Sequence, residues 1–216
     1  MVSPETEGVA MQEQMQNNLC TLSGRIVSEP RYSHSVYDEG FYETAIEVRR
    51  LSDATDVIPV TVSERLVYDV RLEEGDYVTV EGQFRSYNKL VDNRSKLMLS
   101  LFVRDVFEYD ETRNANVIEL TGYICKDPVY RTTPFNREIC DMLVAVNRAY
   151  NKSDYIPCIA WGRNARFSKN LSVGDKITAS GRIQSRAYQK LLPDGTVEER
   201  VAYEISLNRI SKEEDY

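Results

Sequence analysis

The 216-residue chain has a single histidine, His34, in a loop-like segment, and four cysteines, none of them in a C-x-x-C pair. Zinc-ligand spacing is therefore absent, and we predict neither a metal nor a cofactor. A Gly-rich phosphate loop, an H-E-x-x-H motif and a Ser-His-Asp or Cys-His grouping are also absent, so we expect no catalytic residue and no enzyme activity. Cys125, Cys140 and Cys158 lie in apolar stretches, which is typical of buried thiols in a reducing cytoplasm.

Long hydrophobic runs are missing as well. No stretch approaches the roughly 20 apolar residues of a membrane span, so we expect no membrane partner. Residues 1–18 are acidic and rich in Gln and Met, without the basic start and apolar stretch of a secretory signal. They predict a flexible N-terminal arm on a cytoplasmic protein. With 42% hydrophobic and 28% charged residues, the chain has the composition of a globular protein.

One sequence pattern occurs twice. The segment "LSGRIVSEPRY" returns as "LTGYICKDPVY", which places Gly24 and Gly122 98 positions apart, and "DVIPV" at Asp56 returns as "DYIPC" at Asp154. The offset becomes 99 where "EGDYVTVEGQFRS" matches "VGDKITASGRIQS". A match held over this span indicates two copies of one domain, each of about 100 residues, which is enough for an independent core.

Each copy has the pattern of a small barrel. In the second copy, strand-like segments occupy 116–124, 138–148, 154–162, 176–189 and 198–210. A short helix is predicted at the start of 163–175, between the third and fourth strands, and Asp194-Gly195 is typical of a tight hairpin turn. This order predicts an all-β protein with two tandem five-stranded OB-fold barrels.

The predicted domains divide the whole chain. They are the arm 1–18, a first barrel 19–111, a linker 112–116, a second barrel 117–211 and a short acidic C-terminus 212–216.

The net charge of −7 is unevenly distributed. Residues 1–112 contain 11 Lys and Arg and 21 Asp and Glu, a net charge of −10, whereas residues 113–216 contain 16 and 13, a net charge of +3. Such asymmetry indicates an anionic partner for the second half. The alternative is drift of surface charge without a function.

The second copy resembles the bacterial single-stranded DNA-binding proteins, the SSB family. The resemblance rests on "LTGYICKDPVYRTTP", "VAVNRAY", "DYIPCIAWGRNA", "LSVGDKITASGRIQSRAY" and "VAYEISLNRI", and it covers 118–210. The first copy resembles the family less closely. The resemblance implies a two-OB-domain member that binds single-stranded DNA in replication, recombination or repair, in the bacterial cytoplasm at the nucleoid.

The resemblance also implies a set of binding residues. The rings expected to stack on bases are Tyr150, Tyr155, Trp161 and Tyr188. The cations expected to gather phosphates are Arg148, Lys152, Arg163, Arg182 and Arg186. Rings and cations on one face form a binding surface that tolerates any base sequence. Strand alternation places Tyr155 and Trp161 on the same side of their strand. The alternative is that the rings fill the barrel core.

The first copy lacks this surface. The positions that correspond to the four rings hold Ser52, Val57, Ser63 and Lys89. Together with the net charge of −10, this predicts weak or no DNA binding by the same route and a structural or protein-docking role. Other rings leave a different stacking surface open, namely Tyr32, Tyr37, Phe41, Tyr42 and Tyr87.

The sequence leaves alternatives for the assembly of the chain, its protein partners and its ligand. Two barrels per chain favour a homodimer with four barrels, with a monomer or another assembly as the alternative. Replication or repair proteins are candidate partners, but "SKEEDY" lacks the long tail through which the family typically recruits them. RNA is an alternative ligand, since stacking does not detect the 2′-hydroxyl. The competing function is an accessory protein-interaction module, primosome-like or from a mobile element, with weak nucleic-acid binding.

Overall fold

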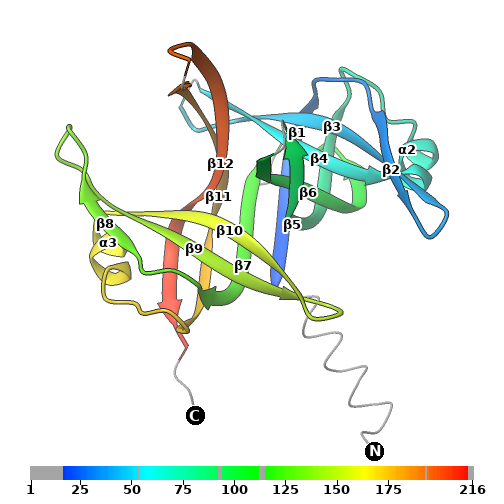
Figure 1. Cartoon of the computed structure of the whole chain (residues 1–216). Helices are drawn as coiled ribbons and strands as arrows, with labels where there is room; N and C mark the ends of the chain where they lie inside the picture. Colours follow the sequence, from blue (N-terminus) through cyan, green and yellow to red (C-terminus); the bar gives the residue numbers. More distant parts are fainter. Residues whose placement is uncertain (1–16, 53, 92–93, 112–114, 193, 214–216) are drawn as a thin grey trace, which may run out of the picture.

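The computed structural model describes residues 17–52, 54–91, 94–111, 115–192 and 194–213. Most of the predicted arm, the first three residues of the linker and the last three residues of the chain therefore lie outside the described residues. The described part is built from strands with two short helices and forms two barrels (Figure 1). The prediction of an all-β protein with tandem OB barrels is confirmed.

The first barrel consists of six strands and one helix. These are β1 (Asn18–Ile26), β2 (Arg31–Val36), β3 (Glu39–Arg49), β4 (Thr55–Ser63), α2 (Glu64–Val70), β5 (Tyr77–Val91) and β6 (Arg94–Glu108). Helix α2 begins where Ser63 Oγ accepts a hydrogen bond from Leu66 N at 3.4 Å, which satisfies one of the free N–H groups of the first turn.

The second barrel repeats this order. Its elements are β7 (Asn116–Ile124), β8 (Val129–Thr132), β9 (Glu138–Arg148), β10 (Lys152–Trp161), α3 (Arg163–Ser168), β11 (Lys176–Leu191) and β12 (Val197–Lys212). Each helix follows the strand predicted to precede it. Each barrel also contains one short strand beyond the predicted five, β2 and β8. Strand β2 is exposed along its whole length, so it lacks the alternation of buried and exposed residues that is typical of a half-buried strand.

One continuous sheet joins the barrels. Strand β1 closes the first barrel against β3, strand β7 closes the second against β9, and β1 pairs with β7 in antiparallel fashion. In that pairing Cys20 lies opposite Ile118, its own counterpart at the 98-residue offset. The two barrels are therefore related by a pseudo-two-fold axis that passes between β1 and β7.

The repeated glycine explains how each barrel closes. A Cβ atom on Gly24 would lie 2.2 Å from the backbone oxygen of Glu47, and one on Gly122 would lie 2.6 Å from that of Ala145. Neither approach tolerates a side chain, so glycine is required where β1 and β7 cross the neighbouring strand.

Each barrel encloses apolar side chains, and those of the two barrels join into one connected core. The largest fully buried side chains include Leu22, Ile46, Ile58, Phe84 and Leu101 in the first barrel, and Leu120, Ile139, Ile156 and Ile177 in the second. Of the three thiols predicted to be buried, Cys140 and Cys158 are buried and Cys125 is partly exposed. Neither helix in the described part of the chain has the length or the apolar character that crossing a membrane requires.

Candidate nucleic-acid interface

The four rings predicted to stack on bases all reach the surface. The exposed fractions are 94% for Tyr150, 46% for Tyr155, 37% for Trp161 and 36% for Tyr188. On β10 the intervening Ile156 is fully buried, as the strand alternation requires. This arrangement excludes the alternative that the four rings fill the barrel core.

The rings do not gather into one cluster. Tyr155 and Trp161 lie about 20 Å apart along β10, at a rise of about 3.3 Å per residue. Trp161 Nε1 donates a hydrogen bond to Ser206 Oγ at 3.1 Å, which fixes the indole against β12. Tyr150 lies in the turn between β9 and β10, with φ at 60°. Tyr150, Tyr155 and Trp161 therefore mark an extended track along β10 and the turn before it.

Tyr188 lies in a groove that both barrels line, which we call the inter-barrel groove. Its walls include Pro157 and Tyr203 from the second barrel and Tyr87 from the first. The guanidinium carbon of Arg186 lies 5.9 Å from the centre of the Tyr188 ring. Tyr87 lines the same groove as Tyr188, although its position in the repeat does not match that of any of the four predicted rings.

The five predicted cations lie in two different settings. Lys152 begins β10, Arg163 begins α3, and both are exposed to solvent. Arg186 is exposed and lies 3.8 Å from a carboxylate oxygen of Glu204. Arg148 and Arg182 instead lie at the junction between the barrels, where each contacts an aspartate.

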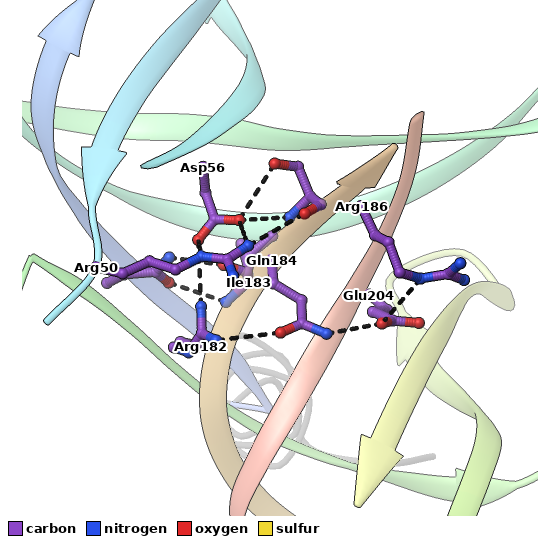
Figure 2. Close-up of polar contacts among 9 residues, drawn as sticks. Arg50, Asp56, Arg182, Ile183, Gln184, Arg186 and Glu204 are labelled. Carbon is purple, nitrogen blue, oxygen red and sulfur yellow. Dashed lines mark hydrogen bonds and ion pairs between the residues drawn. The ribbon is translucent and has the colours of Figure 1, made fainter. Parts of the chain in front are cut away.

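The first of these aspartates, Asp56, forms what we call the Asp56 corner (Figure 2). Its carboxylate accepts from Arg50 Nε at 2.8 Å and Nη2 at 2.6 Å, and from Arg182 Nη1 of the other barrel at 3.2 Å. Ser185 N, also of the other barrel, donates at 2.7 Å. Burial alone would raise the pKa of Asp56, but the hydrogen bonds from Arg50 and Ser185 outweigh it and lower the pKa.

The second aspartate, Asp154, forms the Asp154 corner at the pseudo-equivalent position. Ser86 N of the first barrel donates to Asp154 Oδ1 at 2.7 Å, and Arg148 Nη1 lies 3.5 Å from the same oxygen. Asp154 Oδ2 is buried and has no hydrogen-bond partner. Burial raises the pKa of Asp154, and the hydrogen bond from Ser86 and the charges of Arg148 and Arg85 do not compensate fully.

Sequence analysis did not identify these corners as contacts between the barrels. Residues Asp56 and Ser185 are 129 positions apart, and composition does not pair such distant residues. The available signal was the repeat of Asp56 as Asp154, together with a serine that recurs at the 99-residue offset.

Two tandem OB barrels with solvent-facing rings and arginines define the class of oligonucleotide-binding OB proteins. Residues 115–212 match the model of the "Single-strand binding protein family". Over 100 residues the chain is 37% identical to a single-stranded DNA-binding protein of Clostridium tetani, which covers 42% of this chain and 68% of that protein. The chain belongs to the single-strand binding protein family.

Other relatives are matched over a smaller share of their length. Single-stranded DNA-binding protein 1 of Staphylococcus aureus is 37% identical over 81 residues, and the match spans 34% of this chain and 48% of that protein. The solved structure of the wild-type single-stranded DNA-binding protein from Thermus aquaticus superposes with a TM-score of 0.74 at 17% identity. It covers 92% of this chain and 94% of the other, so the shared fold extends over both barrels.

Proposed function

We propose that this protein binds single-stranded DNA and holds it unpaired during replication, recombination or repair, at the nucleoid in the bacterial cytoplasm. The observation that carries the proposal is the family match over the second barrel, the same barrel that turns four rings toward solvent. Each base stacked on a ring contributes about 1–3 kcal/mol, and every base has a face that can stack. Binding therefore tolerates any sequence, and it involves no chemical step.

The second barrel supplies both parts of the interface in this proposal. Tyr150, Tyr155 and Tyr188 stack on bases, while exposed cations such as Lys152 and Arg163 attract the phosphates. Trp161 contributes at the end of the track. The first barrel positions this surface, because Asp56 holds two arginines and the backbone of β11 in one network.

We further propose that two chains associate into a homodimer with four barrels. Native mass measurement of the free protein distinguishes a dimer from a monomer. A mass of one chain at the concentrations used for DNA binding would overturn this part and leave the binding function intact.

Titration with oligo-dT at two salt concentrations tests the function. We expect the fluorescence of Trp161, the only tryptophan in the chain, to change on binding. The affinity should fall with salt at a slope near −0.7 per phosphate contact. Competition between oligo-dT and oligo-U of the same length measures the preference for DNA. Absence of binding at low salt would reject the proposal and favour a role in protein contacts.

A further inference from the structure

The two junction corners contain the same residue types at matching positions, but their positive charges are arranged differently. At the Asp56 corner, Arg50 and Arg182 together contact both carboxylate oxygens. At the Asp154 corner, Arg148 contacts one oxygen at 3.5 Å and the other oxygen has no partner, although the side chain is only 1% exposed. The second corner therefore lacks one arginine contact that the first has.

The difference originates in two positions of the repeat. Strand β5 carries Gln83 and Arg85, whereas β11 carries Arg182 and Gln184 at the 99-residue offset. The same pair stands in the opposite order. Arg182 therefore reaches Asp56 on the other barrel. Arg85 lies two residues further along β5 than Gln83, which is the counterpart of Arg182.

Arg85 lies near enough to Asp154 to attract its charge, but it forms no hydrogen bond with it. Its guanidinium carbon lies 3.9 Å from the centre of the Phe102 ring, and its Nη2 donates to Gln83 Oε1 at 2.8 Å. It forms no ion pair with a carboxylate of the described residues. Burial, together with repulsion from Arg148 and Arg104, lowers the pKa of Arg85 to about 10, and attraction from Asp154 opposes this shift only in part. The group is still a cation at neutral pH.

Arg85 and Arg148 line one groove on the first barrel, which we call the Arg85 groove. Aromatic side chains form its apolar part, including Phe102 and the stacked pair of His34 and Phe41, whose ring centres are 5.3 Å apart. Lys89 adds a third cation to its lining.

The Arg85 groove also contains one carboxylate. Glu43 Oε1 accepts from Ser33 Oγ at 2.7 Å, and Glu43 also bonds to the Tyr87 hydroxyl. Its partners are therefore hydroxyl groups, and it does not neutralise the two arginines. Cations beside flat rings are the features that bind the backbone and the bases of a single strand.

The groove continues from the rings of the second barrel. Tyr155 N donates to Ser86 Oγ at 2.7 Å, so the strand that carries the Tyr155 ring touches the residue next to Arg85. Tyr87 lines both the Arg85 groove and the inter-barrel groove that contains Tyr188. Single-stranded DNA that stacks on Tyr155 or Tyr188 can therefore extend onto the first barrel.

We propose that Arg85 and Arg148 form a phosphate-binding site at the junction, which carries single-stranded DNA from the rings of the second barrel onto the Arg85 groove. This proposal rests on the proposed function. It assigns DNA contacts to the acidic first barrel, by residues that do not correspond to the four rings of the second. A guanidinium on an apolar ring is well suited to a phosphodiester, because its planar N–H groups match the phosphate oxygens.

The test compares three variants of the full chain with the parent in oligo-dT titrations over a range of salt. Arg85→Gln introduces the residue found at the equivalent position of the second barrel. Arg85→Lys retains the charge and loses the planar group. Arg65→Gln is the matched control, because it removes one charge from the exposed pair with Asp69 on α2.

The slope of the logarithm of affinity against the logarithm of salt concentration should become shallower by about 0.7 in Arg85→Gln, the effect of one phosphate contact. Binding near 0.1 M salt should weaken about 3- to 10-fold. Arg85→Lys should retain the parent slope, and so should Arg65→Gln. Circular dichroism of each variant verifies the fold. Two results would overturn the phosphate site and leave the proposed function standing. One is a folded Arg85→Gln variant that keeps the slope of the parent. The other is an Arg85→Lys variant whose slope is reduced as much as that of Arg85→Gln. If the parent itself fails to bind oligo-dT, both proposals are overturned.

Discussion

The Asp56 and Asp154 corners show how two copies of one motif can take on different tasks. Both place an aspartate against the backbone N–H of a serine on the other barrel, at 2.7 Å in each case. At the first corner two arginines complete the network, and it acts as a structural lock. At the second corner the extra arginine, Arg85, points into a groove. The sequences of the two corners differ in the order of one Gln and one Arg, which are Gln83 and Arg85 on β5 and Arg182 and Gln184 on β11.

The surfaces of the two barrels differ in a related way. The second barrel turns Tyr150, Tyr155, Trp161 and Tyr188 outward and belongs to the more basic half of the chain. The first barrel belongs to the acidic half, yet its groove gathers Arg85, Arg148 and Lys89. Net charge therefore describes this domain too coarsely, because it does not show which charges line the groove.

The largest effect should come from removing rings of the second barrel. Tyr155→Ala with Tyr188→Ala should weaken oligo-dT binding by at least about 2 kcal/mol, since two stacked bases are lost. Equilibrium titration at fixed salt measures the change. The matched control is Tyr77→Ala with Tyr109→Ala, an exposed ring pair of the first barrel with centres 5.2 Å apart. Equal losses in both double variants would remove the distinction between the barrels.

The next effect concerns stability at the corners. Asp56→Asn removes the charge shared by two arginines and should cost about 2–3 kcal/mol of unfolding free energy. This is less than the loss of a fully buried pair, because both arginines are partly exposed. Asp154→Asn should cost less than about 1 kcal/mol, since only one arginine contacts that carboxylate, at 3.5 Å. Urea unfolding followed by circular dichroism measures both. A larger loss for Asp154→Asn would reverse the assignment of the structural lock.

The same two variants should respond to pH with opposite sign. The lowered pKa of Asp56 gives stability that is present above the ordinary aspartate pKa and is lost as the pH falls through the lowered value. The raised pKa of Asp154 means that the folded state holds its proton more tightly, so the parent loses stability as the pH rises toward that value.

Urea midpoints at about pH 3 and about pH 7 resolve this difference, because these two values lie on either side of the ordinary aspartate pKa of about 3.9. From the lower to the higher pH, Asp56→Asn should fall further below the parent, whereas Asp154→Asn should improve relative to it. Changes of the same sign in both variants would contradict the unequal pairing of the two carboxylates.

Much of this architecture can be read from the sequence because it depends on local periodicity. Alternation along 154–162 places Tyr155 and Trp161 outward and Ile156 inward, and the structure has this arrangement. Strand β2 was not predicted, because all its residues are exposed and pairing with β3 alone defines it. A strand of this kind leaves no hydrophobic period in the sequence.

The corners lie beyond such reasoning for a different physical reason. Hydrogen bonds between Asp56 and Ser185, or between Asp154 and Ser86, depend on how two barrels pack across β1 and β7. Arg182 illustrates the consequence: sequence parity placed it beside Tyr188 as a phosphate contact, and the structure pairs it with Asp56. Whether it also contacts DNA stays a prediction.

The smallest effect should come from exchanging the two side chains that distinguish the corners. In the double variant Gln83→Arg, Arg85→Gln, strand β5 carries the order found in β11. The new arginine at position 83 occupies the place from which Arg182 reaches Asp56, so it should donate to the free oxygen of Asp154. We expect a gain of about 1 kcal/mol in unfolding free energy, at the low end for a hydrogen bond to a charged group.

The exchange should also lower the pKa of Asp154, which NMR titration of its carboxyl carbon measures. Oligo-dT binding should weaken at the same time, with the shallower salt dependence expected for Arg85→Gln alone. Gain of stability and loss of DNA contact would then come from one rearrangement that keeps composition and net charge constant. If stability rises while the salt dependence is unchanged, the order of Gln and Arg on β5 matters only for the junction and not for the ligand.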